Sequence, residues 1–287
     1  MPELPEVEIT ARLLDGALAG ARIESVLAPG INALKTFAPP LSALDGQRIR
    51  GVRRRGKQLI VDADGGLSLL IHLMSAGRLQ LYDKLASPRD RTSRLLVRVT
   101  PAGPADSLLE LRLREFGSKQ AAWVKLLATA DLDEDEALAH IGPESWPDPP
   151  ELAGLLDAPR PLHAVLRDQH VIAGIGRSWV DEILWDARLS PYKRGNDLDE
   201  DEAARLREAI RLTLGRALAH YEEHVALPIP DKLPMPLLVH RHEGEPCPRC
   251  GTALRAVHLE DYVIAYCPSC QTEGRVLKDR RLSRLLR

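Results

Sequence analysis

Short apolar and alternating runs, separated by turn-forming residues, follow one another over most of the first 130 residues. They cover 23–27, 49–52, 58–62, 67–73, 78–82, 95–100, 108–114 and 121–127. Gly, Pro and Asp stand between several of these runs, as they do at 64–66 and at 101–104. Strands at this spacing are typical of a sandwich. The first part of the chain therefore predicts an antiparallel β-sandwich.

Helical spacing of apolar residues marks three other segments. The first runs from Pro5 to Ala19 and is followed by Gly20, which can end a helix. The second covers 178–187. The third begins after the acidic run 199–202 and carries a stripe of four apolar residues, Leu206, Ile210, Leu214 and Leu218. We interpret this stripe as a face packed in a core rather than as a cofactor site.

Changes in composition suggest where the domains end. The segment from Asp131 to Pro150 is acidic and Pro-rich, and prolines between 228 and 236 indicate an extended connector. We therefore predict a multidomain α+β protein with a sandwich at 1–130 and a helical domain at 131–236. A four-cysteine module at 237–273 and a basic tail at 274–287 follow, the tail being a surface helix or a disordered extension.

Charge and hydropathy narrow the cellular setting. The 287 residues carry a net charge of −2, yet six basic residues and no acid lie between Arg48 and Lys57, and the last residues are also basic. Basic and acidic faces together can bind a polyanion, although a charge run is more often a solvated face. No apolar run approaches the ~18 residues of a membrane span, and the first residues carry acids where a signal peptide carries bases. We expect a cytoplasmic protein, without membrane association.

All four cysteines lie in two Cys-x-x-Cys pairs, Cys247 with Cys250 and Cys267 with Cys270. Two such pairs at this spacing suit one tetrahedral Zn2+ site on a β-hairpin, with four thiolate ligands. The alternative is four free buried thiols. A closed four-cysteine site leaves no open coordination position, so we predict one structural zinc ion.

The chain starts with Met1-Pro2-Glu3-Leu4-Pro5-Glu6. Removal of Met1 leaves a secondary amine at Pro2, and an α-amino group titrates near ~8, low enough to be a nucleophile at neutral pH. Glu3 and Glu6 can then move protons during imine formation. The alternative is that Pro5 simply opens a helix whose dipole the two carboxylates complement. Likewise, Gly174-Ile175-Gly176-Arg177 before a helix is either a tight turn or a phosphate site.

With these residues together, the chain resembles the formamidopyrimidine-DNA glycosylase / endonuclease VIII (Fpg/Nei) family over nearly its whole length. The most specific motifs are PELPEVE at 2–8 and the cysteine spacing. The others are Arg54-Arg55-Gly56-Lys57, His72-Leu73 with Gly77, Arg114-Glu115-Phe116-Gly117, Ile141-Gly142-Pro143-Glu144, the segment 174–185, and 244–247 through Cys270-Gln271.

The resemblance implies a bifunctional repair enzyme that removes oxidised bases from double-stranded DNA and nicks the abasic site. It implies a catalytic N-terminal sandwich, a helix-two-turn-helix domain and a zinc finger, with DNA between the lobes. Pro2 would attack the sugar, Glu3 would handle protons, Glu6 would support the site, and Lys57 would contact phosphate. Arg114 and Phe116 match positions that fill the gap left by the flipped base. A nucleoid-associated monomer is expected.

Three departures from the family pattern stand out. Met74 falls one place before the usual wedge methionine, so it is either a wedge or a core residue. Arg177 replaces the usual Asn of the glycine loop, and Tyr262 replaces the usual finger Arg. These changes leave a second function open, a catalytically weak protein that binds damaged or abasic DNA. A zinc-ribbon protein that binds RNA or protein would leave PELPEVE unexplained.

Overall fold

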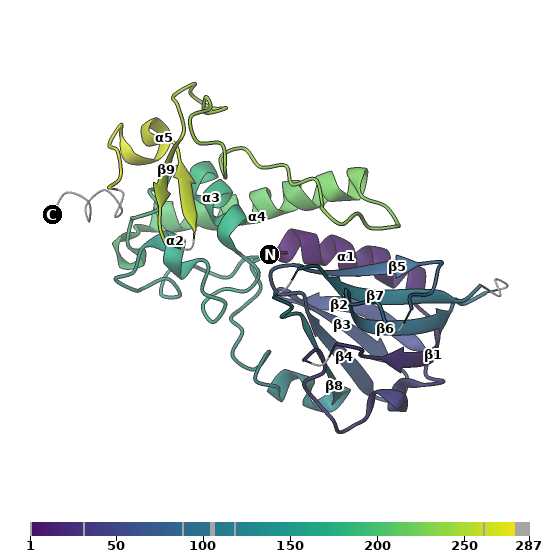
Figure 1. Cartoon of the computed structure of the whole chain (residues 1–287). Coiled ribbons are helices and arrows are strands. Elements are labelled where there is room, and N and C mark those ends of the chain that lie inside the picture. Colours follow the sequence, from purple (N-terminus) through teal and green to yellow (C-terminus); the bar gives the residue numbers. More distant parts are fainter. Residues whose placement is uncertain are drawn as a thin grey trace. The chain divides into compact units, whose positions relative to one another are not determined.

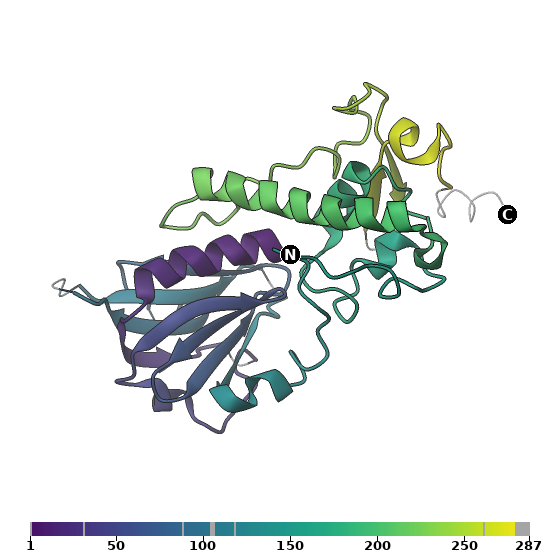
Figure 2. The ribbon, with the colours of Figure 1, turned by 180° about the vertical axis from the view of Figure 1, so that it is seen from behind.

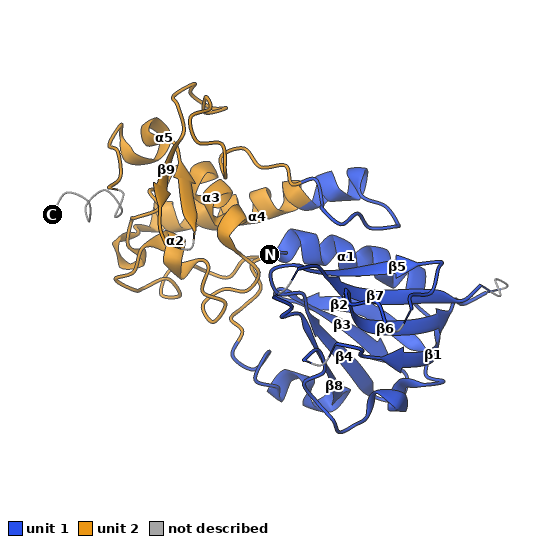
Figure 3. Ribbon diagram, viewed as in Figure 1, with its two compact units in different colours: residues 1–140, 218–234 blue, residues 141–217, 235–287 orange. Residues whose placement is uncertain are grey.

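The computed structural model describes residues 2–30, 32–87, 89–103, 107–117, 119–260 and 262–278. The chain forms two compact units (Figure 3). Unit 1 contains Met1–His140 and Leu218–Pro234, and unit 2 contains Ile141–Ala217 and Met235–Arg287. The domain boundaries expected from composition stay a prediction. Most of the basic tail, from 279 onward, lies outside the described residues.

Unit 1 is built on two four-stranded antiparallel sheets (Figure 1). The order in one sheet is β1-β6-β7-β5, and the order in the other is β2-β3-β4-β8. The strands are β1 (Arg22–Leu27), β2 (Ile49–Arg55), β3 (Gln58–Ala63), β4 (Leu67–His72), β5 (Gly77–Tyr82), β6 (Ser93–Thr100), β7 (Leu109–Glu115) and β8 (Trp123–Ala128). The predicted antiparallel sandwich is therefore confirmed, and the ends of each strand lie within three residues of the ends of its predicted run.

Helix α1 (Leu4–Leu18) spans the two sheets at their edges, because it contacts β2 and β3 of one sheet and β5 of the other. Figure 2 shows it running along the strands. Its apolar positions Val7, Leu14 and Leu18 are completely buried in the core that fills the sandwich. Burying side chains of this size contributes about 2 kcal/mol each. Two short 3-10 turns, Leu41–Leu44 and Thr129–Glu134, border the same unit.

The Pro-rich connector after the long helix α4 (Glu200–His224) also packs on unit 1. Ile229 is buried in the core of the sandwich. Gln80 of β5 donates a hydrogen bond of 2.6 Å to the carbonyl oxygen of Ile229, and a second of 3.1 Å to Asp231. An extended, proline-containing segment is thus fixed by side-chain hydrogen bonds rather than by a strand ladder.

Unit 2 is helical and ends in a β-hairpin. Its elements are α2 (Leu162–Val165), α3 (Arg177–Asp186), a 3-10 turn (Gly195–Asp197), most of α4, β9 (Arg255–His258), β10 (Val263–Tyr266) and α5 (Pro268–Thr272). The predicted helix at 178–187 is α3, and the predicted apolar stripe lies in α4, where all four of its residues are buried. Within the described ranges, no helix is both long enough and apolar enough to cross a bilayer.

Candidate active site and nucleic-acid interface

The first turn of α1 buries two carboxylates next to Pro2. The helix begins at Leu4 with Pro5 in its first turn, and Glu3 and Glu6 form a capping box. The Glu6 Oε2 atom accepts the backbone N–H of Glu3 at 2.8 Å. Glu3 is 2% exposed and Glu6 is 5% exposed. Both carboxylates are therefore buried at the start of a helix that packs on the two sheets.

Tyr221, on the last turns of α4, completes this group and was not foreseen from the sequence. Its hydroxyl donates a hydrogen bond of 2.6 Å to Glu6 Oε1. Burial and the negative charges of Glu6 and Glu3 raise the pKa of Tyr221 well above its usual value. The phenol therefore stays protonated and remains a donor at any working pH.

The basic motif of β2 packs against α1 at the same end of the sandwich. Arg54 pairs with Glu8 of α1 at 2.6 Å, with both side chains largely buried. This contact brings PELPEVE and Arg54-Arg55-Gly56-Lys57 together. Lys57 lies in the two-residue turn between β2 and β3 and is 9% exposed. A lysine is rarely so buried without a function or a partner.

His72, at the end of β4, pairs with Gln58 of β3, and the positive charge of Lys57 acts on its ring. Burial and that charge lower the pKa of His72 from 6.5 to about 4. The ring is therefore neutral at pH 7. Its Nδ1 atom accepts the backbone N–H of Met74 at 3.0 Å, and its face stacks on Trp123 at 5.4 Å between ring centroids. His72 thus fixes the turn that follows β4.

We expect acid to weaken unit 1 through His72. The unfolded state binds a proton below pH 6.5 whereas the native state does so only below about 4, so stability is lost as the pH falls between these values. His72→Asn keeps an acceptor and cannot titrate. In urea unfolding, the wild type should lose roughly 3 kcal/mol more than this variant between pH 7.5 and 4. His224→Asn, at an exposed histidine, is the control and should lose as much as the wild type.

Met74 occupies the turn between β4 and β5. Its φ is 49°, in the left-handed region, and it is half-buried without joining the hydrophobic core of the described sandwich residues. Gly77 then pairs with Glu115, and a Cβ on Gly77 would lie 2.4 Å from the carbonyl oxygen of Leu73. A glycine is therefore required there to hold the Met74 turn beside the end of β7.

Arg114 and Phe116 project from that end of β7. Phe116 is 43% exposed, and the Arg114 guanidinium lies 4.5 Å from the centre of its ring. Arg114 also donates a hydrogen bond of 2.6 Å to the hydroxyl of Tyr82. An exposed ring supported by a cation is suited to stacking on a base.

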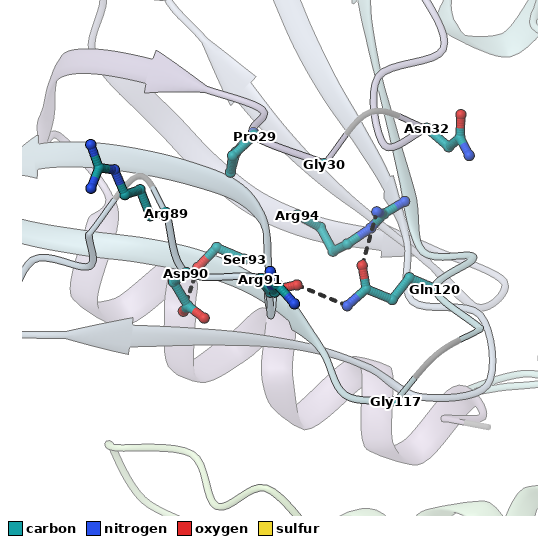
Figure 4. A pocket seen from close by; sticks show the side chains of 10 residues that line it. All are labelled: Pro29, Gly30, Asn32, Arg89, Asp90, Arg91, Ser93, Arg94, Gly117 and Gln120. Carbon is teal, nitrogen blue, oxygen red and sulfur yellow. Dashed lines mark hydrogen bonds between the residues drawn. The ribbon is translucent and has the colours of Figure 1, made fainter.

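The buried side chain of Arg94 holds the loop after β7, which carries Phe116. Arg94 is 4% exposed, lies 3.8 Å from Glu115, and donates to Gln120 at 3.3 Å (Figure 4). Gln120 in turn donates to the carbonyl oxygen of Arg91 at 2.9 Å and to that of Glu115 at 3.0 Å. The pocket in Figure 4 is lined by this network. Through these bonds Gln120 ties Glu115, the residue before Phe116, to the loop that carries Arg91.

In unit 2, the glycine loop leads directly into α3. Gly174 has φ of 99°, which favours glycine, and Gln169 holds the loop by accepting from the N–H of Gly174 and donating to the carbonyl oxygen of Ile175. Gly176 is the N-cap residue, so Arg177 is the first residue of the helix, and it is exposed. The loop thus places a cation where backbone N–H groups and the helix dipole already favour an anion.

Tyr262 lies in the turn between β9 and β10, and its ring contacts side chains from the segment 163–177. Its ring centre is 5.3 Å from the Arg177 guanidinium and 4.1 Å from that of Arg167, and it stacks on His163 at 5.6 Å. Arg167 and His163 were not foreseen. The only sequence signal was a basic residue and a histidine in an otherwise apolar stretch, which is too weak to assign a site.

A buried aspartate ties this group to the hairpin. Asp181 of α3 contacts His240 at 2.7 Å and His163 at 3.2 Å, and accepts the N–H of Ala265 in β10 at 3.0 Å. Burial lowers the pKa of His163, outweighing the attraction of Asp181. Glu182 accepts three consecutive backbone N–H groups, from Leu238 to His240. Asp181 therefore holds the hairpin against α3, and Glu182 holds the segment 238–240 against the same helix.

The side chains of the four cysteines gather at one place in unit 2. Their sulfur atoms all lie within 4.8 Å of one another, with Cys250 and Cys267 at 3.5 Å and Cys247 and Cys270 at 4.0 Å. Four sulfurs at ~2.3 Å from a central ion in a tetrahedron are about 3.8 Å apart, so the residues fit one metal ion. They come from the loop before β9 and from the start of α5.

The surroundings of Cys247 and Cys250 favour thiolates, whereas burial raises the pKa values of Cys267 and Cys270. The Trp185 indole N–H donates to Cys247 Sγ at 3.3 Å, and Arg249 stacks on the Trp185 ring. Hydrogen bonds from the side chain and backbone of Thr252 lower the pKa of Cys250 to about 6. Hydrogen bonds of this kind orient ligands and strengthen metal sites.

Comparisons with known proteins agree with this arrangement. The model of the formamidopyrimidine-DNA glycosylase N-terminal domain matches residues 1–118, and that of its H2TH domain matches residues 151–227. Formamidopyrimidine-DNA glycosylase of Thermus thermophilus is 32% identical over 96% of this chain and 100% of its own length, and that of Gluconobacter oxydans is 32% identical over 94% and 100%.

Solved structures give the same answer. The chain superposes with a TM-score of 0.81 and 27% identity on Lactococcus lactis Fpg in complex with DNA containing N7-benzyl-Fapy-dG, covering 94% of this chain and 100% of the other. A complex of Lactococcus lactis Fpg with abasic-site DNA also gives 0.81 and 27%, covering 94% and 99%. The chain therefore belongs to the formamidopyrimidine-DNA glycosylase / endonuclease VIII (Fpg/Nei) family of DNA repair glycosylases.

Proposed function

We propose that this protein excises oxidised bases from double-stranded DNA through a Schiff base of Pro2, and then nicks the abasic site by β-elimination. One observation carries the proposal. In a chain of this family, the buried carboxylates of Glu3 and Glu6 lie beside Pro2 in the first turn of α1. The solved Lactococcus lactis Fpg complexes contain damaged or abasic-site DNA, which supports the choice of substrate.

The chemistry follows from a neutral secondary amine next to a carboxyl group. With Met1 removed, Pro2 N attacks the sugar C1′, and the base leaves with a proton that Glu3 supplies. The first product is an aminal, whose nitrogen returns its proton to Glu3. Glu3 passes this proton to O4′, the C1′–O4′ bond breaks, and the open sugar is left as an iminium ion between Pro2 and C1′. Its charge acidifies the C2′ proton, and loss of that proton expels the 3′ phosphate. The damaged nucleotide must leave the stack first, at a cost of a few kcal/mol.

Other residues of unit 1 bind the DNA around the extruded nucleotide. Lys57, in the turn beside α1, binds the phosphate near the lesion and assists elimination. Met74, Arg114 and Phe116 enter the gap in the duplex, because the turn between β4 and β5 lies beside the end of β7. A half-exposed Phe116 backed by the Arg114 guanidinium provides a stacking surface for the estranged base.

Unit 2 provides a phosphate clamp and a metal-stabilised hairpin. Arg177 offers a bidentate fork at a helix N-terminus, and Tyr262 offers a hydroxyl and a ring between Arg177 and Arg167. The metal is one structural zinc ion, because four thiolates in a tetrahedron are the usual zinc ligand set. When bound, it holds the loop before β9 against α5 and takes no part in the reaction.

A gel assay tests this function. The processed protein is incubated with duplexes that each carry one defined oxidised base or an abasic site, and products are resolved on denaturing gels. Cleavage of at least one base lesion, leaving an unsaturated sugar on the 3′ end, is expected. In the family the finger Arg is associated with a second, δ-elimination step, and Tyr262 replaces it here. A dominant 3′-phosphate product would therefore show that Tyr262 does not limit the reaction to β-elimination. Tight binding without any cleavage would overturn the enzymatic proposal in favour of a damage-binding protein.

Arg177→Ala should weaken binding to every duplex, damaged or not, because a phosphate contact carries no sequence information. The slope of log affinity against log salt should fall by about one phosphate contact. Fluorescence anisotropy over a range of salt concentrations measures both. Arg211→Ala, at an exposed arginine on α4 that pairs with Glu208, is the matched control. An equal change of slope in both variants would contradict a specific clamp at Arg177.

A further inference from the structure

Tyr221 donates a hydrogen bond to Glu6, a carboxylate that also supports the N-terminal turn. Glu6 Oε2 accepts the N–H of Glu3 at 2.8 Å, and Glu6 Oε1 accepts the Tyr221 hydroxyl at 2.6 Å. Tyr221 is completely buried. The two bonds form a continuous path from α4 to the residue next to Pro2.

Tyr221 lies on a buried face of the last turns of α4. Leu218, Tyr221 and Val225 recur at i, i+3 and i+7, are all buried, and belong to unit 1 with α1. An ion pair between Arg12 of α1 and Glu222 fastens the two helices next to this point. The Tyr221 ring is therefore held by its helix and by its buried neighbours, and its hydroxyl is held by Glu6.

We propose that Tyr221 is a positioning residue for the Schiff-base step, acting through Glu6 on the placement of Glu3 and Pro2. This inference rests on the proposed function. A hydrogen bond from a neutral phenol to a carboxylate stabilises the ionised form and fixes its rotamer. With Glu6 fixed, the N–H of Glu3 is fixed, and so is the peptide that carries the Pro2 nitrogen.

Loss of the hydrogen bond between Tyr221 and Glu6 is expected to disturb the placement of the reacting groups rather than the affinity for DNA. The reacting nitrogen must approach C1′ to about 3–3.5 Å, and a small misplacement of a catalytic group lowers rates by one to two orders of magnitude. The buried tyrosine makes no contact with solvent, so it cannot itself touch DNA. Its effect must therefore appear in the rate of the covalent step.

Tyr221→Phe removes only the hydroxyl and tests the proposal. The single-turnover rate of borohydride trapping with an abasic-site duplex should fall about tenfold. The Kd for the same duplex carrying a tetrahydrofuran analogue should stay within twofold. Tyr266→Phe is the matched control, because Tyr266 is equally buried and its hydroxyl accepts a backbone N–H in unit 2. That variant should trap at the wild-type rate.

A double-mutant cycle assigns the effect to Glu6. If Tyr221 acts through it, Glu6→Gln and Glu6→Gln with Tyr221→Phe should trap at similar rates, and the two changes should not add. A wild-type rate in Tyr221→Phe, or a Kd that rises as much as the rate falls, would overturn the inference and leave the proposed function intact. No trapped complex with the wild type would overturn the proposed function, and this inference with it.

Discussion

The chain that begins at Pro2 is expected to form a borohydride-stable complex with an abasic-site duplex, and the same chain with its N-terminus blocked is expected to form none. The comparison needs one protein with a protease-removable extension ahead of Pro2, assayed before and after cleavage. The trapping rate should differ by on the order of a thousandfold or more, because removing a covalent nucleophile abolishes the step it performs. Denaturing gels measure the trapped complex.

The size of this effect follows from the local structure. Glu3 and Glu6 are buried, so a proton can pass between carboxylate and sugar without competition from bulk water. An amide nitrogen in the blocked protein has no lone pair free for attack, whereas the carboxylates remain in place. The comparison therefore changes the nucleophile and leaves its surroundings unchanged.

Two further samples complete the experiment. Pro2→Gly with Met1 removed keeps an amine but loses the ring, so slower trapping is expected rather than none. Mass spectrometry of the trapped peptide should place the sugar on residue 2. Trapping through an internal lysine, in a protein whose N-terminus is still blocked, would remove Pro2 from the mechanism.

Cys250→Ala is expected to lower the affinity for duplex DNA by at least a hundredfold. A structural zinc site contributes on the order of 10 kcal/mol to the folding of its module. Without it, the loop before β9 is no longer tied to α5, and the hairpin turn that carries Tyr262 loses its support. Anisotropy with an abasic-site analogue measures the affinity, and metal analysis should fall from about one zinc per chain to none.

Ser269→Ala, an exposed change within the second Cys-x-x-Cys pair, is the matched control and should keep both zinc and affinity. Because a cysteine variant can misfold more widely, circular dichroism and thermal melting should show that the β-sandwich is retained. Removing zinc from the wild type with a chelator should reproduce the loss, and adding zinc should restore it. Full affinity in the metal-free protein would contradict a role of the metal centre in binding.

Local patterns in the sequence were enough to predict the fold class. Eight short apolar or alternating runs bounded by turn residues marked the strands, including β3, β4 and β6, which are buried on both faces. The cysteine spacing likewise predicted the metal centre. Both signals are local: their meaning depends on residues a few positions apart.

The candidate site was predicted in part. PELPEVE and Lys57 are read from short motifs, and the structure brings them together through Arg54 and Glu8. The half-buried setting of Met74, outside the core, could not be read from the sequence, since it depends on the pairing of Gly77 with Glu115.

Only the tertiary structure revealed the partners that lie far away along the chain. Tyr221 is 215 residues from Glu6, and Asp181 is 59 residues from His240 and 84 from Ala265. In the sequence, Tyr221 is one more apolar position on a helix, and Asp181 is an ordinary polar residue. The sequence by itself determined the eight strands of the sandwich, the three helices with an apolar stripe and the grouping of the four cysteines, because periodicity and spacing are local properties. Which buried polar groups meet was decided by packing, since a hydrogen bond between distant residues leaves no periodic trace in the chain.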